Sequence, residues 1–250
     1  MDLLRYLIRP YLLTRYQLHV LTGTGPSGKK GAQGVPKTVK PGWSRLKQAV
    51  WNCHVKQFHD ASCSVASVVT CLNAIQSVKN GSSPRIHQQE ILERVKTGHW
   101  KERMGPNGYN GRRGLPLPLL GRVVEDSLTV YRISVTAMDV VQVPQRGPNR
   151  PSVEEELKQR LRDFDVNGKG LIIAHFDQGT LIPTLNIPHI SPVGAYDSKS
   201  EEVTLLDVDQ DLKEPYKVPF TRFCKGLSCN YHHVFRAFGY GSGGYVYIEL

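Results

Sequence analysis

Residues 57–75 read QFHDASCSVASVVTCLNAI, and this stretch decides the fold. A polar, turn-prone run ends at Cys63, and apolar residues then recur at the spacing of a buried helical stripe. Either Asp60 or Ser62 suits the N-cap position, so the pattern predicts a helix that begins near Cys63. A thiol in a first helical turn lies beside unpaired backbone N–H groups and the positive end of the helix dipole, and both favour the nucleophilic thiolate.

The remaining patterns place helices before strands along the chain. Helical patterns run from Trp43 to about Ile75, where Cys71 is expected to be a small core residue, and over 85–96, about 117–127 and 152–164. The last of these opens with a capping-box pair, Ser152 and Glu155, whereas 97–118 read as loop. Strand patterns cover 128–136, 170–176, 189–197, 202–209 and 244–250. Helices followed by a mostly antiparallel sheet predict an α+β fold.

The composition is that of an ordinary folded domain. The chain has 250 residues, of which 40% are hydrophobic and 22% charged, so it can bury a core without disulfides. Its five cysteines are an odd number and suggest no disulfide framework. We therefore expect free thiols in a reducing compartment, which favours the cytoplasm, while N-terminal targeting stays an alternative.

The net charge of +10 is concentrated at the N-terminus. Residues 1–50 hold nine Lys and Arg against one acidic residue, a local +8, which leaves only +2 for the rest. This distribution argues against a nucleic-acid-binding core. Residues 1–42 are expected to form a basic arm or linker, and 43–250 a single folded domain. The opening 1–21 are amphipathic and could contact a membrane surface, act as an import sequence or pack on the domain.

Three further residues complete a candidate nucleophilic site around Cys63. Gln57, six residues upstream, can supply an amide N–H to an oxyanion. His189 begins one predicted strand and Asp207 lies on the next, so neighbouring antiparallel strands can place the imidazole beside the carboxylate. The order of glutamine, cysteine, histidine and aspartate, helix first and sheet second, predicts nucleophilic catalysis by a thiol.

These residues resemble the papain-like cysteine proteases, and more narrowly the catalytic domain of phytochelatin synthases. The segments that carry the resemblance are SCSVASVVTCLNAI, HISPVGAYDSKSEEVTLLDV and GYVYIEL. The resemblance implies a papain-like fold with Cys63 as nucleophile, His189 as acid and base, Asp207 as its orienting group and Gln57 at the oxyanion. It also implies attack on the amide before the glycine of glutathione, which gives a γ-glutamylcysteinyl enzyme. Water or a second thiol peptide would then take the acyl group.

The chain departs from that family at several positions. Ser62 and Ser64 stand where the family has an aromatic residue and a glycine, and Pro188 replaces the glycine before the histidine. Gln210 stands where the family has an arginine that is expected to bind a peptide carboxylate, and we expect no Cys-rich C-terminal extension of the kind that the plant enzymes have. We therefore expect hydrolysis, or a related acyl transfer, rather than metal-stimulated polymerisation, on glutathione or a related γ-glutamyl or thiol peptide.

Metal binding and nucleic-acid binding have weaker support in the sequence than the nucleophilic site around Cys63. Four residues could ligate a metal, although their spacing is also that of a surface loop with two free thiols: Cys224, Cys229, His232 and His233. Cys53 and His54 could join such a site. The basic and aromatic segment 94–113 could touch an anionic ligand or RNA, but a solvated loop is the simpler reading. No cofactor is expected for catalysis, and a divalent metal–thiolate complex stays a candidate substrate or activator.

Two rival functions stay open, as does a homodimer. The first is a papain-like peptidase that cleaves a peptide leader or another protein substrate, because it would use the same four residues. The second is a basic protein that binds a metal or an anion, in which Cys63 is inert. The reactivity of Cys63 toward a thiol probe separates this second function from the enzymes.

Overall fold

The computed structural model describes residue 14 and residues 42–81, 85–182, 187–228 and 241–250. Most of the expected basic arm therefore lies outside the described residues. The same is true of three of the four metal-ligand candidates, Cys229, His232 and His233.

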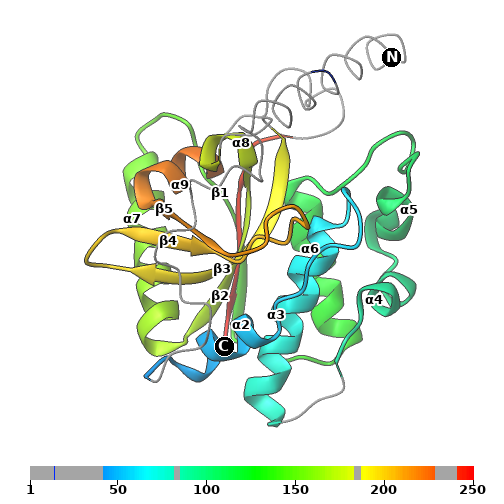
Figure 1. Cartoon of the computed structure of the whole chain (residues 1–250), viewed down its shortest axis with the longest axis horizontal. Helices are drawn as coiled ribbons and strands as arrows, with labels where there is room; N and C mark the ends of the chain where they lie inside the picture. Colours follow the sequence, from blue (N-terminus) through cyan, green and yellow to red (C-terminus); the bar gives the residue numbers. More distant parts are fainter. Residues whose placement is uncertain (1–13, 15–41, 82–84, 183–186, 229–240) are drawn as a thin grey trace.

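Helices and one antiparallel sheet make up the described part of the chain, so the α+β prediction is confirmed (Figure 1). The helices are α2 (Arg45–Asn52), α3 (Cys63–Asn80), α4 (Gln88–Arg94), α5 (Trp100–Met104), α6 (Leu117–Val130), α7 (Arg150–Arg162), α8 (Gln178–Leu181) and α9 (Phe220–Leu227). The strands are β1 (Ala137–Gln142), β2 (Gly170–Asp177), β3 (Pro188–Asp197), β4 (Glu202–Leu205), β5 (Tyr216–Pro219) and β6 (Gly244–Glu249). They form one six-stranded sheet in the order β1-β6-β2-β3-β4-β5, and every neighbouring pair is antiparallel.

Helix α3 is buried on all sides over its first thirteen residues, Cys63 to Ile75, including Cys71 as predicted. A helix that is apolar all round belongs inside a core, and α3 packs against β2 and β3 on one side and against α2, α4 and α6 on others. It ends where the breaker sequence begins, at Gly81, whose φ of 74° suits glycine. The helix that carries Cys63 is thus a central element of the core.

The sheet lies between two layers of helices, as Figure 1 shows. α3 and α6 cover one face, whereas α7 and α9 cover the other. All eight residues of β2 are buried, which fits a central strand covered on both faces. The Ser67 hydroxyl lies 2.8 Å from the carbonyl of Cys63 and 2.9 Å from that of Ile190, so it ties α3 to β3.

Several local predictions are wrong. Of the strand expected at 128–136, the first three residues end α6, because Leu128 continues the buried face of that helix, the others form a turn and a loop, and β1 begins only at Ala137. The loop expected at 97–118 contains α5, whose Trp100 is fully buried. Within the helical stretch 43–75, residues 53–62 separate α2 from α3, and α3 begins at Cys63 as predicted, whereas β5 and α9 were not predicted.

The capping-box prediction is also wrong. Asn149 is the N-cap of α7, and Ser152 lies inside the first turn, where its hydroxyl donates to the Asn149 carbonyl at 2.8 Å. The rest of the helix agrees with the prediction to within two residues at each end.

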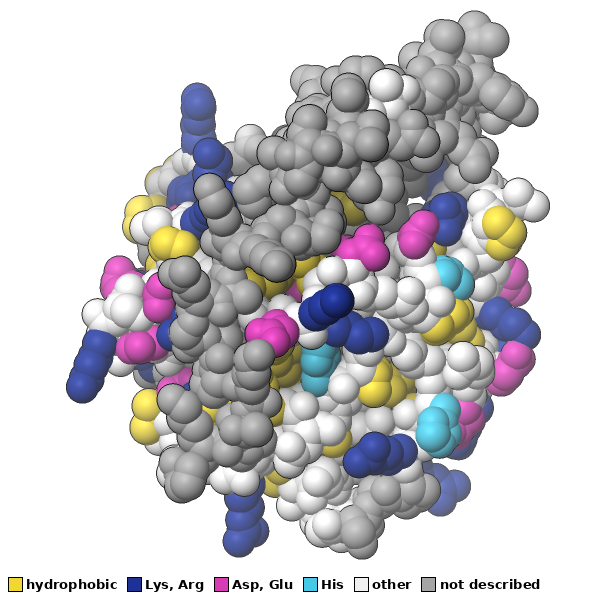
Figure 2. Space-filling view, viewed as in Figure 1, with side chains coloured by type: hydrophobic (Ala, Val, Ile, Leu, Met, Phe, Trp, Pro, Cys, Tyr) yellow, Lys and Arg dark blue, Asp and Glu magenta, His cyan; other side chains and the backbone are white. Residues whose placement is uncertain are grey.

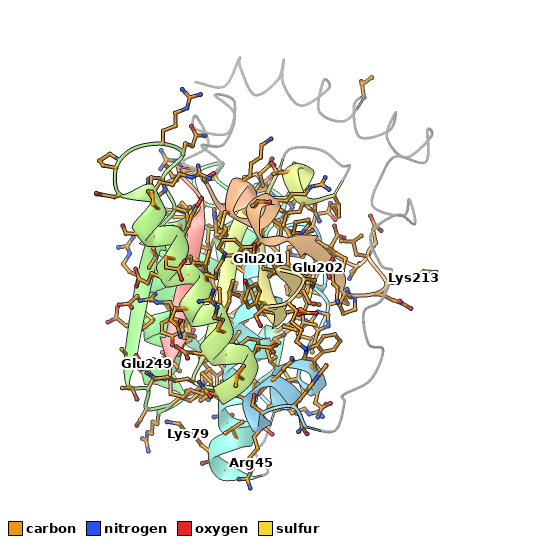
Figure 3. All side chains as sticks on the ribbon, turned by 90° about the vertical axis from the view of Figure 1, so that its left-hand side faces the viewer. Arg45, Lys79, Glu201, Glu202, Lys213 and Glu249 are labelled. Carbon is orange, nitrogen blue, oxygen red and sulfur yellow. The ribbon has the colours of Figure 1, made fainter. Side chains whose placement is uncertain are left out.

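The described surface has no large region of one charge on the face in Figure 2, where acidic, basic and histidine side chains alternate. This agrees with the small net charge of the chain beyond residue 50. Charged side chains at the edges of the fold, such as Arg45, Lys79 and Glu249, point outward (Figure 3). Among the described residues, no helix has both the length and the apolar character needed to cross a bilayer.

Candidate active site

Cys63 is the first residue of α3, and Ser62 is its N-cap. The Ser62 hydroxyl makes no bond to the helix and instead accepts the N–H groups of Phe58 and His59, each at 3.0 Å. The backbone carbonyl of Ser62 accepts the N–H groups of Val65 and Ala66. The first turn of α3 therefore begins directly at the cysteine, without a side-chain cap over its backbone donors.

His189 lies near the start of β3 and reaches the same place from the sheet. Its Nε2 lies 2.7 Å from Oδ1 of Asp207, and the Cys63 side chain is near enough to the ring to raise the pKa of the imidazole. Because Nε2 is taken by the carboxylate, Nδ1 is the ring nitrogen left for the thiol. The imidazole also packs nearly perpendicular to the ring of Phe176 on β2, with centroids 5.5 Å apart. The imidazole is therefore fixed on three sides.

Asp207 lies two residues beyond the end of β4, not on the strand as predicted. Its Oδ1 also accepts the N–H of Asp209 at 2.9 Å, and its Oδ2 accepts the hydroxyl of Tyr216 at 2.8 Å. Burial alone would raise the Asp207 pKa, but the His189 charge and these hydrogen bonds outweigh it and lower the pKa to about 2. The carboxylate is thus ionised although it is fully buried.

The pKa of His189 moves in the opposite direction. Burial lowers it, but the charge of Asp207 and the hydrogen bonds with Asp207 and Cys63 prevail, and the pKa lies well above its usual value. His189 and Cys63 are only 4% and 8% exposed. The site therefore stabilises a protonated imidazole between a carboxylate and a thiol, which is the arrangement that activates a sulfur nucleophile.

Gln57 lies on the segment that leads into α3. Its backbone N–H donates to the carbonyl of Val208 at 2.8 Å, and its own carbonyl accepts Nε2 of Gln210. Gln57 is only 6% exposed, and its Oε1 has no hydrogen-bond partner among the described residues. The segment that holds Gln57 is thus joined directly to the loop that begins at Asp207.

The structure brings Cys63, His189 and Asp207 together by side-chain contacts. It joins Gln57 to the same loop through the backbone. Sequence reasoning missed Tyr216 and Lys56, which hold Asp207 from two further sides. No pattern marks Tyr216, because it lies on a four-residue strand that pairs with β4 only in the folded chain.

The weaker metal candidates do not form a site in the described part of the chain. There, no three His, Cys, Asp or Glu side chains are close enough to hold an ion. Cys224 was read as part of a surface loop, but it is buried in α9, and burial raises its pKa to about 12. Cys53 lies at the end of α2, where burial also raises its pKa. Neither thiol has the surroundings of a reactive cysteine.

The segment 94–113 is more ordered than predicted. Its His99 and Tyr109 rings stack with centroids 3.7 Å apart, and Arg103 donates to the Gly98 carbonyl at 2.8 Å. These contacts are within the segment itself, so they neither support nor require an anionic ligand.

A comparison of the sequence with protein families matches residues 30–230 to the family described as phytochelatin synthase. The match includes the four candidate site residues. A search of curated proteins returned no match.

Proposed function

The chain belongs to the phytochelatin synthase family, and from this premise we propose that it is a cysteine acyl hydrolase or transpeptidase acting on glutathione or a closely related thiol peptide. The family has a papain-like fold and is one of cysteine acyltransferases, and membership implies glutathione γ-glutamylcysteinyl transferase activity. One observation carries the proposal for the site. It is the contact of His189 with both Cys63 and the ionised Asp207.

In the proposed first half-reaction, His189 takes the proton of the Cys63 thiol and the thiolate attacks the carbonyl carbon of the cysteinyl–glycine amide. The side-chain amide of Gln57 and the backbone N–H of Cys63 donate to the oxyanion that forms. His189 then gives its proton to the amide nitrogen as the C–N bond breaks. Glycine leaves, and the γ-glutamylcysteinyl group remains as a thioester on Cys63.

In the second half-reaction, His189 takes a proton from the incoming nucleophile. Water gives γ-glutamylcysteine, whereas the amine of a second peptide gives a longer thiol peptide. In both cases the tetrahedral intermediate expels the Cys63 sulfur. Asp207 stays ionised throughout and holds the orientation of the imidazole.

We further propose that hydrolysis prevails over polymerisation. Gln210 is neutral, and its side-chain amide donates to the Gln57 carbonyl. Asp209, beside it, is acidic and accepts the side-chain amide of Gln178 at 3.1 Å. A neutral and an acidic residue at these positions favour water over a second substrate that carries a carboxylate.

Intact-mass spectrometry of the protein with glutathione tests the proposal. The wild-type chain should gain the mass of one γ-glutamylcysteinyl group, and Cys63→Ala should gain none. Product analysis should give γ-glutamylcysteine and glycine in equal amounts. A wild-type protein that forms no adduct with glutathione, but cleaves members of a peptide library, would instead be a papain-like peptidase.

A further inference from the structure

We propose that Lys56 is a positioning residue that holds the orienting carboxylate and the oxyanion glutamine in one fixed arrangement. The inference deepens the proposed function and rests on the roles given there to Asp207 and Gln57. Among the described residues, the Lys56 ammonium group bonds to the Asp207 and Leu212 carbonyls and makes no hydrogen bond to the Cys63 thiol or the His189 imidazole.

The ammonium group of Lys56 closes the loop that carries Asp207. Its Nζ lies 2.6 Å from the carbonyl of Asp207 and 2.6 Å from the carbonyl of Leu212. The two carbonyls are the ends of a six-residue loop, 207–212. His54 adds a third contact, because its Nε2 lies 3.2 Å from the Asp207 carbonyl. The backbone of Asp207 is therefore held from the helical side of the molecule as well as from the sheet.

The same short segment carries Gln57 directly after Lys56. The Gln57 N–H donates to Val208, which follows Asp207, and Gln210 donates back to the Gln57 carbonyl. The Lys56 carbonyl is in turn held by the side-chain amide of Gln88 at 2.8 Å. A shift of the loop would therefore displace Asp207 and Gln57 together, and Lys56 supplies the bonds that oppose such a shift.

Charge makes these bonds stronger than the others between the two segments. An ammonium group bonded to a carbonyl forms a charge-assisted hydrogen bond, which is about twice as strong as a neutral one. Lys56 is partly buried, and burial lowers its pKa, while the nearby Asp207 and Asp209 carboxylates oppose that shift. A lysine that is withdrawn from water, with two backbone acceptors at 2.6 Å, has a positional role rather than a solvating one.

Two other lysines provide matched controls. Lys47 is 6% exposed and pairs with Asp165, away from the loop, so Lys47→Met removes a buried lysine without touching the site. Lys213 directly follows Leu212, is exposed and points outward (Figure 3), so Lys213→Met removes one charge near the same loop. Lys56→Met is compared with both.

The first measurement is the single-turnover rate of acylation by glutathione. We expect Lys56→Met to lower this rate on the order of 10²-fold, as for a misplacement of about 1 Å, with a much smaller change in KM. Lys47→Met should lower the melting temperature but leave the rate of the folded protein within about threefold, and Lys213→Met should change neither. An unchanged rate in Lys56→Met, or an equal loss in either control, would overturn the proposal.

The second measurement needs no substrate. Iodoacetamide alkylation of Cys63 is followed by peptide mass spectrometry over a range of pH, because that profile reports the interaction of the thiol with His189. Lys56→Met should shift the profile, and the two controls should reproduce the wild type. A wild-type protein without glutathione turnover, but with this shift in Lys56→Met, would contradict the proposed substrate alone. Lys56→Gln, which keeps a donor but no charge, replaces Lys56→Met if that variant does not fold, with the same expected direction.

Discussion

The hydroxyl of Tyr216 donates to Oδ2 of Asp207 at 2.8 Å, on the carboxylate oxygen that His189 does not use. Tyr216 is the first residue of β5, the strand at one edge of the sheet, and is buried. Burial and the Asp207 carboxylate both hold the Tyr216 pKa well above its usual value, so the hydroxyl keeps its proton and remains a donor. Each oxygen of the orienting carboxylate thus has its own side-chain donor.

Tyr216→Phe removes one of these donors. A hydrogen bond to the ionised form lowers a carboxyl pKa, so the pKa of Asp207 should rise in the variant. The acidic limb of the pH–rate profile, where Asp207 becomes protonated, should therefore move to higher pH than in the wild type. The acylation rate should also drop about tenfold. The pH–rate profile measures both. Tyr196→Phe is the control, because that buried hydroxyl has no partner among the described residues, and matching profiles in the two variants would contradict the prediction.

Gln57→Ala tests the oxyanion role without changing the thiol. Loss of one oxyanion donor should lower the acylation rate by about 10²–10³-fold with little change in KM. Alkylation of Cys63 by iodoacetamide forms no oxyanion, so its rate should match the wild type. A parallel loss in both reactions would mean that Gln57 supports the nucleophile itself.

Ser67→Ala tests the connection between α3 and β3. Ser67 and Ser127 are both buried, and each donates to the carbonyl four residues before it. Only Ser67 also contacts a strand, at the Ile190 carbonyl, so its loss should release Cys63 relative to His189. We expect a lower acylation rate in Ser67→Ala than in Ser127→Ala, although both should destabilise the fold by about 1–3 kcal/mol, as measured by denaturant unfolding.

His175 should make stability depend on pH. It is fully buried on β2, its Nε2 donates to the Leu115 carbonyl at 2.9 Å, and burial lowers its pKa to about 4. The His175 imidazole binds a proton near pH 6.5 in the unfolded chain but only near pH 4 in the folded chain. Acidification between these two values therefore favours unfolding. The shift corresponds to about 3 kcal/mol of stability, present above pH 6.5 and lost by about pH 4.

Urea unfolding at several pH values measures this dependence. In the same window the His189–Asp207 pair contributes stability that hardly changes with pH, because the raised His189 pKa loses its contribution only at higher pH and the lowered Asp207 pKa only at lower pH. His175→Gln should flatten the loss by removing the titrating group. An equally steep dependence in this variant would show that another group causes it.

The strongest patterns predicted the fold well. α3, β2, β3 and β6 were predicted to within two residues at nearly every end, because long apolar runs have few alternatives in a core. β5 and α9 escaped prediction, since a four-residue strand and a short helix carry too little periodicity. Residues 128–136, which include the end of α6, were read as a strand because their β-branched and aromatic residues favour strands when tertiary packing is ignored.

The site was predictable only in part, and for a physical reason. Cys63 and His189 come from patterns that mark a helix start and a strand start. The residues that donate hydrogen bonds to Asp207 are not connected to it by any local sequence pattern. Lys56 is 151 residues away in sequence, and Tyr216 lies on β5, whose pairing with β4 was not predicted. Contacts of this kind depend on how the layers pack. The catalytic roles themselves stay predictions until the variants are measured.

The position of the Ser62 hydroxyl has one more consequence. Because it bonds to its own loop and not to α3, the loop and the helix are closed by separate sets of hydrogen bonds. Amide hydrogens of Phe58 and His59 can therefore exchange with solvent through a local opening, whereas those in the middle of α3 exchange only through global unfolding. The loop that leads to Cys63 can therefore open locally while the helix that carries the thiol stays folded.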